Sequence, residues 1–272
     1  MMKNVNYLVQ QHGCGPYQPA YLGNVNDESL QGGFPVFIKQ DGEIYKVTEI
    51  GYVFLTGMNN LKSVEIPDCV TKIEGSAFNS LTGLINVKLP KELTVINYNT
   101  FYNCTSLTSI TIPDKVTAIG ASAFSNCTSL STINIGENIT FVSGDAFYNT
   151  ALYNSQTTGI VYIDYIACDW KRTGSTNITI RDGTRLLAEK IFYKSGHSGQ
   201  GKLTINLPTS VKYIGPNAFS NQDYYYNNVA DQLYYLGKEE QWNAIIREHG
   251  PFNVTYAGNP DSNYGWEIHY AE

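Results

Sequence analysis

The stretch LTSITIPDKVTAIGASAFSNCTS, residues 107–129, decides the fold because its pattern recurs through much of the chain. Several of its apolar positions belong to columns whose members lie 23 residues apart. The clearest columns are Leu61, Leu84, Leu107 and Leu130, and Phe78, Phe101, Phe124 and Phe147. Columns that share one period predict stacked coils, since repeats of about 20 to 50 residues are typical of solenoids.

Each apolar position has a physical role in such a coil. Ile110 and Ile112 alternate with polar residues, which predicts a short strand with one buried face. Pro113 ends this strand because proline cannot donate to a strand ladder. Ile119 belongs to a second extended stretch, and Phe124 is expected to fill the interior of the following turn. One coil cannot bury its apolar face alone, so neighbouring coils must stack and pair their strands.

Two polar columns agree with this interpretation. Threonine recurs where stacked hydroxyl groups can hydrogen-bond across coils, at positions 48, 71, 94, 117 and 140. Asparagine follows the phenylalanine column by two residues, at positions 103, 126, 149 and 221. An asparagine in a turn can satisfy backbone groups that would otherwise be buried without a partner.

The period breaks after Phe147. Residues 159–163 and 165–168 are expected to form a hairpin, and the repeat resumes at Ile178 and again at Ile205. The expected organisation is an N-terminal segment and β-hairpin cap over 1–46, regular repeats over 47–153, a hairpin insertion over 154–177, further repeats over 178–228 and a C-terminal cap over 229–272.

The two caps have their own patterns, because a solenoid must cover its terminal coils. Asp41-Gly42 lies between two short apolar runs and predicts a hairpin turn. Near the C-terminus, residues 233–236 predict a strand, and Trp242 belongs to a short amphipathic helix. Further strands are expected around Val254 and Ile268.

These columns resemble the BspA-type leucine-rich repeat family. The matching pattern is I-P-x-x-V-T-x-I-G-x-x-A-F-x-N-C-T-S, best seen at residues 112–129, and the resemblance spans roughly residues 34–272. The expected fold is a leucine-rich-repeat solenoid of 23-residue coils, mostly β, with a parallel sheet, short turns or helical segments, and a right-handed superhelix. The resemblance also implies a cell-surface or extracellular location on host-associated bacteria, and a role in adhesion.

Composition limits the function classes. The 272 residues have a formal net charge of -6, which argues against a nucleic-acid partner because that surface would have to be basic. Apolar runs stay below the roughly 18 residues that span a bilayer, so no membrane span is predicted. The residues at positions 1–6, MMKNVN, lack the apolar core of a signal peptide.

Residues with potential chemistry are few and scattered. Cys104 and Cys127 share a column and could form a disulfide or a redox pair, but two buried thiols are the simpler interpretation. His12 and Cys14 lie in a predicted loop, and Asp261 with Asn263 lacks the spacing of a calcium loop. We therefore predict no catalytic residue, no cofactor and no metal site.

A polar strip is the candidate site. Side chains alternate along a strand, so the residues between the buried anchors should point outward together. These residues are Glu65, Lys88, Thr111, Asn134, Thr179 and Asn206. The same pattern fits an ordinary solvated face, and two other contact surfaces compete with it. They are the exposed tyrosines, drawn from a group that includes Tyr98, Tyr102, Tyr148, Tyr153 and Tyr224–226, and the loop at 196–201.

The sequence thus predicts a non-catalytic binding solenoid that contacts proteins of a host or of other bacteria. A carbohydrate-binding protein is the first alternative, with exposed tyrosines and Trp170 stacking on sugar rings. A structural spacer within a larger surface protein is the second, and an enzyme is the least favoured.

Overall fold

A computed structural model describes the chain over residues 37–40, 43–46, 48–52, 59–171, 175–192, 203–219, 231–247 and 266–271. The chain divides into two compact units. The first unit comprises Met1–Ile139 and Asp145–Asn154, and the second comprises Thr140–Gly144 and Ser155–Glu272. The turn predicted at Asp41-Gly42, the loop at 195–201 and the strand around Val254 lie outside the described residues.

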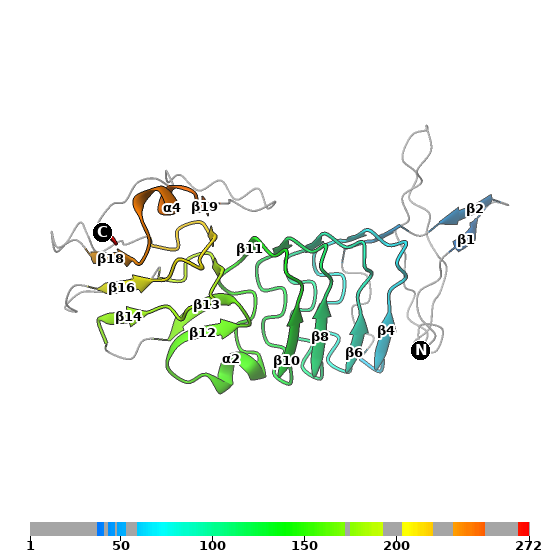
Figure 1. Cartoon of the computed structure of the whole chain (residues 1–272). Helices are drawn as coiled ribbons and strands as arrows, with labels where there is room; N and C mark the ends of the chain where they lie inside the picture. Colours follow the sequence, from blue (N-terminus) through cyan, green and yellow to red (C-terminus); the bar gives the residue numbers. More distant parts are fainter. Residues whose placement is uncertain are drawn as a thin grey trace. The chain divides into compact units, whose positions relative to one another are not determined.

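In the first unit, one row of short strands lies side by side along the coils (Figure 1). The row consists of β4 (Ser63–Glu65), β6 (Asn86–Lys88), β8 (Ser109–Ile112) and β10 (Thr132–Ile135). β4 pairs with β6 and β8 with β10, both parallel, and each residue lies opposite the one 23 positions later. The Thr108 amide donates to the Ile85 carbonyl over 3.4 Å, which connects the two pairs.

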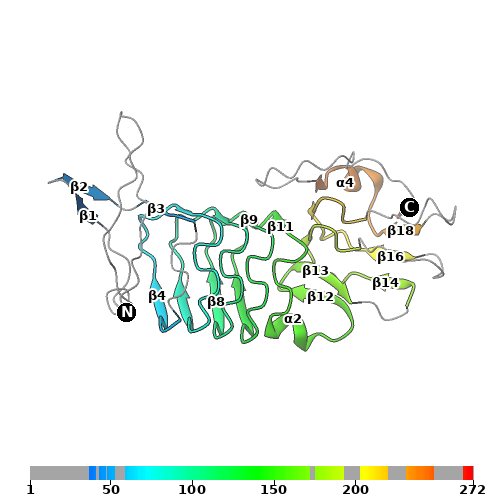
Figure 2. The same cartoon turned by 180° about the vertical axis from the view of Figure 1, so that it is seen from behind.

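A second row of two-residue strands follows in each coil (Figure 2). It contains β3 (Glu49–Ile50), β5 (Lys72–Ile73), β7 (Val95–Ile96) and β9 (Ala118–Ile119). β3 pairs with β5 and β7 with β9, again in parallel. The hydroxyls of Thr71 and Thr117 each donate over 3.4 Å to the carbonyl of the preceding threonine in the column. The threonine column therefore bonds across coils as the sequence predicts.

The phenylalanine column forms the centre of this unit. Phe78, Phe101, Phe124 and Phe147 are all at most 2% exposed. Successive rings are stacked, with centroids 5.2, 5.4 and 5.5 Å apart and interplanar angles of 10°, 8° and 1°. The spacing of about 4.8 Å between neighbouring strands lies within the range of centroid distances of packed aromatic rings, so the same residue type can repeat from coil to coil without a void.

The turn asparagines have a role that the sequence did not reveal. Asn103, Asn126 and Asn149 have φ values of 59°, 63° and 60°, a left-handed conformation that asparagine tolerates better than most residues. Their side chains bond one another or a serine across coils: Asn149 Nδ2 donates to Asn126 Oδ1 over 2.8 Å. The left-handed backbone and the side-chain hydrogen bonds between coils therefore explain why asparagine recurs at this turn position.

The second unit contains two sheets. The first has the order β12-β13-β15-β17-β19, and the second has the order β14-β16-β18-β20. β12 and β13 are antiparallel, as expected for the hairpin, and the remaining pairs are parallel. The strands are β12 (Gly159–Ile163), β13 (Ile166–Lys171), β14 (Asn177–Thr179), β15 (Leu186–Leu187), β16 (Thr204–Leu207), β17 (Tyr213–Ile214), β18 (Asp231–Tyr235), β19 (Ile246–Arg247) and β20 (Trp266–Tyr270).

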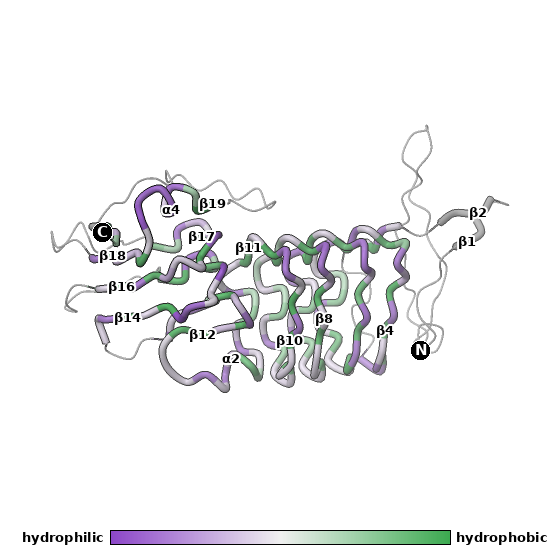
Figure 3. The backbone as a smooth tube through the Cα atoms, viewed as in Figure 1, coloured by the Kyte–Doolittle hydropathy of each residue, from purple (hydrophilic) through white to green (hydrophobic). Residues whose placement is uncertain are grey.

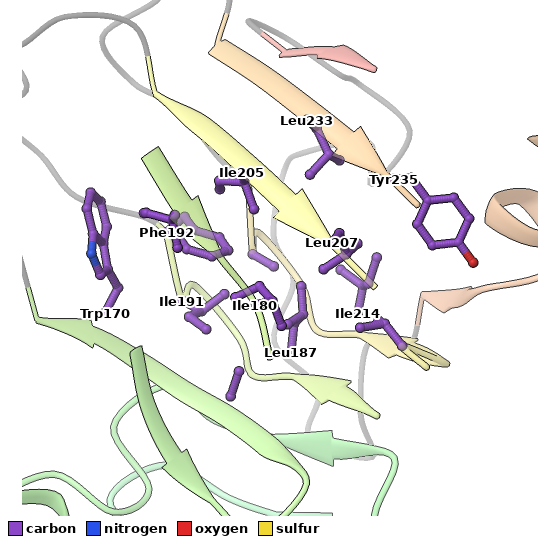
Figure 4. Packing of buried hydrophobic residues seen from close by; sticks show 14 of the residues in the cluster. Trp170, Ile180, Leu187, Ile191, Phe192, Ile205, Leu207, Ile214, Leu233 and Tyr235 are labelled. Carbon is purple, nitrogen blue, oxygen red and sulfur yellow. The ribbon is translucent and has the colours of Figure 1, made fainter. Parts of the chain in front are cut away.

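A cluster of aliphatic and aromatic side chains fills the second unit (Figure 4). Ile180, Ile205 and Leu207 are each at most 2% exposed. Trp170 belongs to the same cluster and is 3% exposed, with its ring centroid 6.0 Å from that of Phe192. The expectation that Trp170 stacks on a sugar is therefore wrong, because the indole is already packed in the core.

Five smaller elements complete the described structure. They are β1 (Phe37–Gln40), β2 (Glu43–Lys46), β11 (Phe141–Val142) and the helices α2 (Ala151–Ser155) and α4 (Glu239–Asn243). β1 and β2 form an antiparallel hairpin. Polar and apolar residues alternate along β8 and β10 (Figure 3). Neither described helix has the length and apolar character needed to cross a membrane.

Candidate partner-binding face

The predicted strip lies on the outer face of the strand rows. In the first unit Glu65, Lys88, Thr111 and Asn134 occupy β4, β6, β8 and β10, and all four are exposed. Their neighbours along the strands point inward: Val64 and Ile110, for example, are each 2% exposed. Period-two alternation thus separates a buried face from a polar one, as the sequence predicts.

Adjacent members of the strip contact each other across coils. Lys88 Nζ donates a hydrogen bond to Glu65 Oε1, and this bond raises the pKa of the Lys88 ammonium group. Asn134 Nδ2 donates to Thr111 Oγ1 over 3.3 Å. The first unit therefore offers a charged half, at β4 and β6, and an uncharged half, at β8 and β10.

The two remaining predicted residues lie in the second unit. Thr179 is on β14 and Asn206 is on β16, where the Asn206 amide donates to Thr179 Oγ1 over 3.4 Å and to Asn177 Oδ1 over 3.1 Å. The six predicted residues therefore form three hydrogen-bonded pairs on neighbouring strands, two pairs in the first unit and one in the second.

The strand register adds two residues that the sequence did not single out. Tyr234 on β18 lies opposite Asn206, and His269 on β20 lies opposite Tyr234. The tyrosine and histidine rings are stacked with centroids 4.4 Å apart, and His269 Nε2 is 2.7 Å from Gln232 Oε1. These strands are 28 and 35 residues apart, so a fixed period misses them. The alternation along β18 could have identified Tyr234, because its neighbours Leu233 and Tyr235 are buried and it must therefore point to the other face.

The described residues contain no group of three or more His, Cys, Asp and Glu side chains arranged to hold a metal ion. The thiols of Cys104 and Cys127 are buried and donate to the carbonyls of Phe78 and Phe101, over 3.2 and 3.0 Å. Interaction with the neighbouring Cys127 thiol, together with burial, raises the pKa of Cys104 well above its usual value. A thiol held neutral in this way is a poor nucleophile.

The tyrosines that compete with the strip have different environments. Tyr98 and Tyr148 are 45% and 54% exposed, whereas Tyr153 is 8% exposed and packs edge-on against Tyr148. Tyr224–226 and the loop at 196–201 lie outside the described part of the chain. Of the tyrosines named in the sequence analysis, Tyr98 and Tyr148 thus offer the most accessible rings among the described residues.

Stacked coils with parallel strand ladders and buried leucine and phenylalanine columns define a leucine-rich-repeat solenoid. The chain belongs to the BspA type leucine rich repeat family, whose model matches residues 48–167 and 169–242 in six copies. A comparison with curated proteins found no match.

Solved structures of bacterial leucine-rich repeat proteins are similar to this chain. One from Bacteroides ovatus is 19% identical, covers 86% of this chain and 70% of its own length, and has a TM-score of 0.43. One from Bacteroides capillosus is 32% identical over 38% of this chain and 74% of its own, with a TM-score of 0.34. A leucine rich cell surface protein from Faecalibacterium prausnitzii is 19% identical over 80% and 90%, with a TM-score of 0.36. The family assignment rests on the repeat model, because all three TM-scores are below 0.5.

Proposed function

We propose that this chain is a non-catalytic, protein-binding module that acts at the bacterial cell surface or after secretion, in adhesion to host or bacterial proteins. The observation that carries the proposal is the exposed polar face of β4, β6, β8 and β10. Extended faces of stacked strands are the surfaces that solenoids commonly use to bind partners. Membership of the BspA-type family supports the surface location.

The chemistry of this face favours a broad contact. Its side chains are small or paired: Thr111 and Asn134 bond each other, and Lys88 is bonded to Glu65. An ion pair at the rim of an interface changes the association rate and the salt dependence more than the affinity. The uncharged half, centred on Thr111 and Asn134, is therefore where we expect the partner to be buried.

The test is direct binding of the full chain, immobilised on a biosensor, to a panel of purified host extracellular proteins and bacterial surface proteins. The same preparation is applied to a glycan array. We expect saturable binding to a protein. We also expect this binding to weaken when the Thr111–Asn134 region is altered. Strong saccharide binding without any protein partner would overturn the proposal in favour of a carbohydrate-binding protein.

A further inference from the structure

Tyr98 presents the face of its ring to Gly75 in the preceding coil. A Cβ atom added to Gly75 would lie 2.5 Å from Tyr98 Cζ and 2.7 and 2.8 Å from Cε1 and Cε2. An approach along the ring plane would meet the phenol oxygen first, so three adjacent ring carbons at similar distances mean that the glycine lies under the ring face. Tyr98 is 45% exposed, and its opposite face is therefore available to solvent.

Tyr52 forms a second wall beside this ring. Tyr52, Gly75 and Tyr98 occupy one column, 23 residues apart, so the two tyrosines are separated by two coils. Two coil spacings amount to about 9.6 Å, yet the ring centroids are 6.4 Å apart, with an interplanar angle of 47°. The rings lean toward each other over the glycine. Tyr52 is 61% exposed, and the next member of the column is the small residue Ala121.

Two glutamates and a lysine lie close to Tyr52 and Gly75 in the sequence. Glu49 lies three residues before Tyr52, and Glu74 directly precedes Gly75. Lys72 contacts both carboxylates: its Nζ is 4.0 Å from Glu49 Oε2 and is also bonded to Glu74 Oε1. Two carboxylates and one ammonium group give these three residues a formal charge of -1.

We propose that Tyr52 and Tyr98 form an aromatic corner that receives an arginine or lysine side chain from a protein partner. Aromatic faces carry partial negative charge and attract cations placed within about 6 Å of the ring centre. The neighbouring acidic triad attracts the same charge, and it disfavours a phosphate or carboxylate ligand. The inference rests on the proposed function, because it specifies the chemistry of one contact that the protein partner makes.

Gly75 is what makes the corner possible. A side chain at position 75 would occupy the space under the Tyr98 ring, and the ring would have to swing away. The φ angle of Gly75 is not in the left-handed region, so alanine is compatible with its backbone. Gly75→Ala therefore displaces the ring without removing it. A purely structural role for Gly75 would leave ligand binding unchanged.

The experiment uses a fluorescein-labelled peptide with three arginines separated by glycines, and a glutamine peptide of the same length as its control. Binding to the full chain is measured by fluorescence anisotropy. We expect Tyr98→Ala, Tyr52→Ala and Gly75→Ala each to weaken arginine-peptide binding about 2- to 5-fold, the range for exposed cation–π contacts. Tyr148→Ala, which removes an exposed ring elsewhere in the same unit, should leave binding unchanged. Thermal melts establish that every variant is folded.

Two results would overturn the inference: equal peptide affinity in wild type and in the three corner variants, or equal binding of arginine and glutamine peptides. Methyl glycosides are titrated in parallel. If the chain binds these sugars but not the arginine peptide, and Tyr98→Ala abolishes the sugar binding, the corner would be reassigned to saccharides. Because the peptide assay needs no natural partner, its failure is distinct from failure of the proposed function. The latter would show as an absence of protein binding in the biosensor panel.

Discussion

The Phe101 and Phe124 rings stack 8° from parallel with their centroids 5.4 Å apart, although the two residues are 23 positions apart in the chain. Each ring is fully buried and is also stacked on a further phenylalanine on its other side. The column transmits packing from coil to coil, so removing one ring affects two interfaces.

Phe124→Ala should lower the free energy of unfolding of the first unit by about 3–5 kcal/mol, because it leaves a cavity between two remaining rings. Urea denaturation followed by circular dichroism measures the change. Phe124→Leu, which keeps much of the volume, is the matched control and should cost less. A loss below about 1 kcal/mol in the alanine variant would contradict the packing described here.

Two substitutions at Asn126 can distinguish the effect of backbone conformation from the effect of the side-chain hydrogen bond. Its φ is 63°, and its Oδ1 accepts the 2.8 Å bond from Asn149. Asn126→Ala should destabilise by about 2 kcal/mol, because it loses the bond and puts alanine in the left-handed region, which alanine tolerates less well than asparagine. Asn126→Gly, which removes only the bond, should cost about half as much. Equal losses in urea denaturation would show that the left-handed backbone contributes nothing.

Alkaline pH should destabilise the protein through its buried thiols. Interaction with Cys127 and burial raise the pKa of Cys104, and burial raises the pKa of Cys168, above the usual value of 9.0. Above pH 9 the unfolded thiols ionise while the folded ones stay neutral, so this contribution to stability is complete below pH 9 and declines as pH rises. Each thiol should contribute a slope of about 1.4 kcal/mol per pH unit.

The check is urea denaturation between pH 8 and 10.5 in the presence of a reductant. Cys168→Ala should reduce the pH dependence of the free energy of unfolding of the second unit by the contribution of one thiol. This holds whatever the substitution does to stability at pH 8. An unchanged slope in this variant would exclude Cys168 as the source, since lysine and tyrosine ionisation is common to both proteins.

The uncharged half of the strip can be altered without disturbing the fold. Thr111→Glu with Asn134→Lys reproduces in β8 and β10 the pair that Glu65 and Lys88 already form in β4 and β6. We expect a melting temperature within about 2 °C of wild type, because surface substitutions usually change stability little. Binding to a partner found in the biosensor panel should weaken at least 10-fold, since bulky charges would be buried in the contact.

The matched control places the same two charges elsewhere on the first unit, as Thr128→Glu with Ser129→Lys, at exposed turn positions. Retained affinity in the strip variant, or equal loss in the control, would move the partner contact away from Thr111 and Asn134.

Sequence alone determined the repeat and its buried columns. When apolar residues recur at a fixed period, stacked coils bury all the equivalent residues together. This principle predicted the burial of Phe101 and the outward direction of Thr111. A fixed period also limited the prediction. In the second unit, Tyr234 lies opposite Asn206 and His269 lies opposite Tyr234, in strand pairs whose spacing differs from 23 residues.

Only the tertiary structure decided which aromatic side chains are accessible. Trp170 lies within β13 and Tyr98 lies just after β7, yet Trp170 is in the core and Tyr98 lies over a glycine at the surface. The aromatic corner depends on Gly75 leaving space for a ring from the next coil, and on Tyr52 leaning across from the coil before. Contacts between side chains two coils apart depend on rotamers and on the size of the residue between them, which no single repeat specifies.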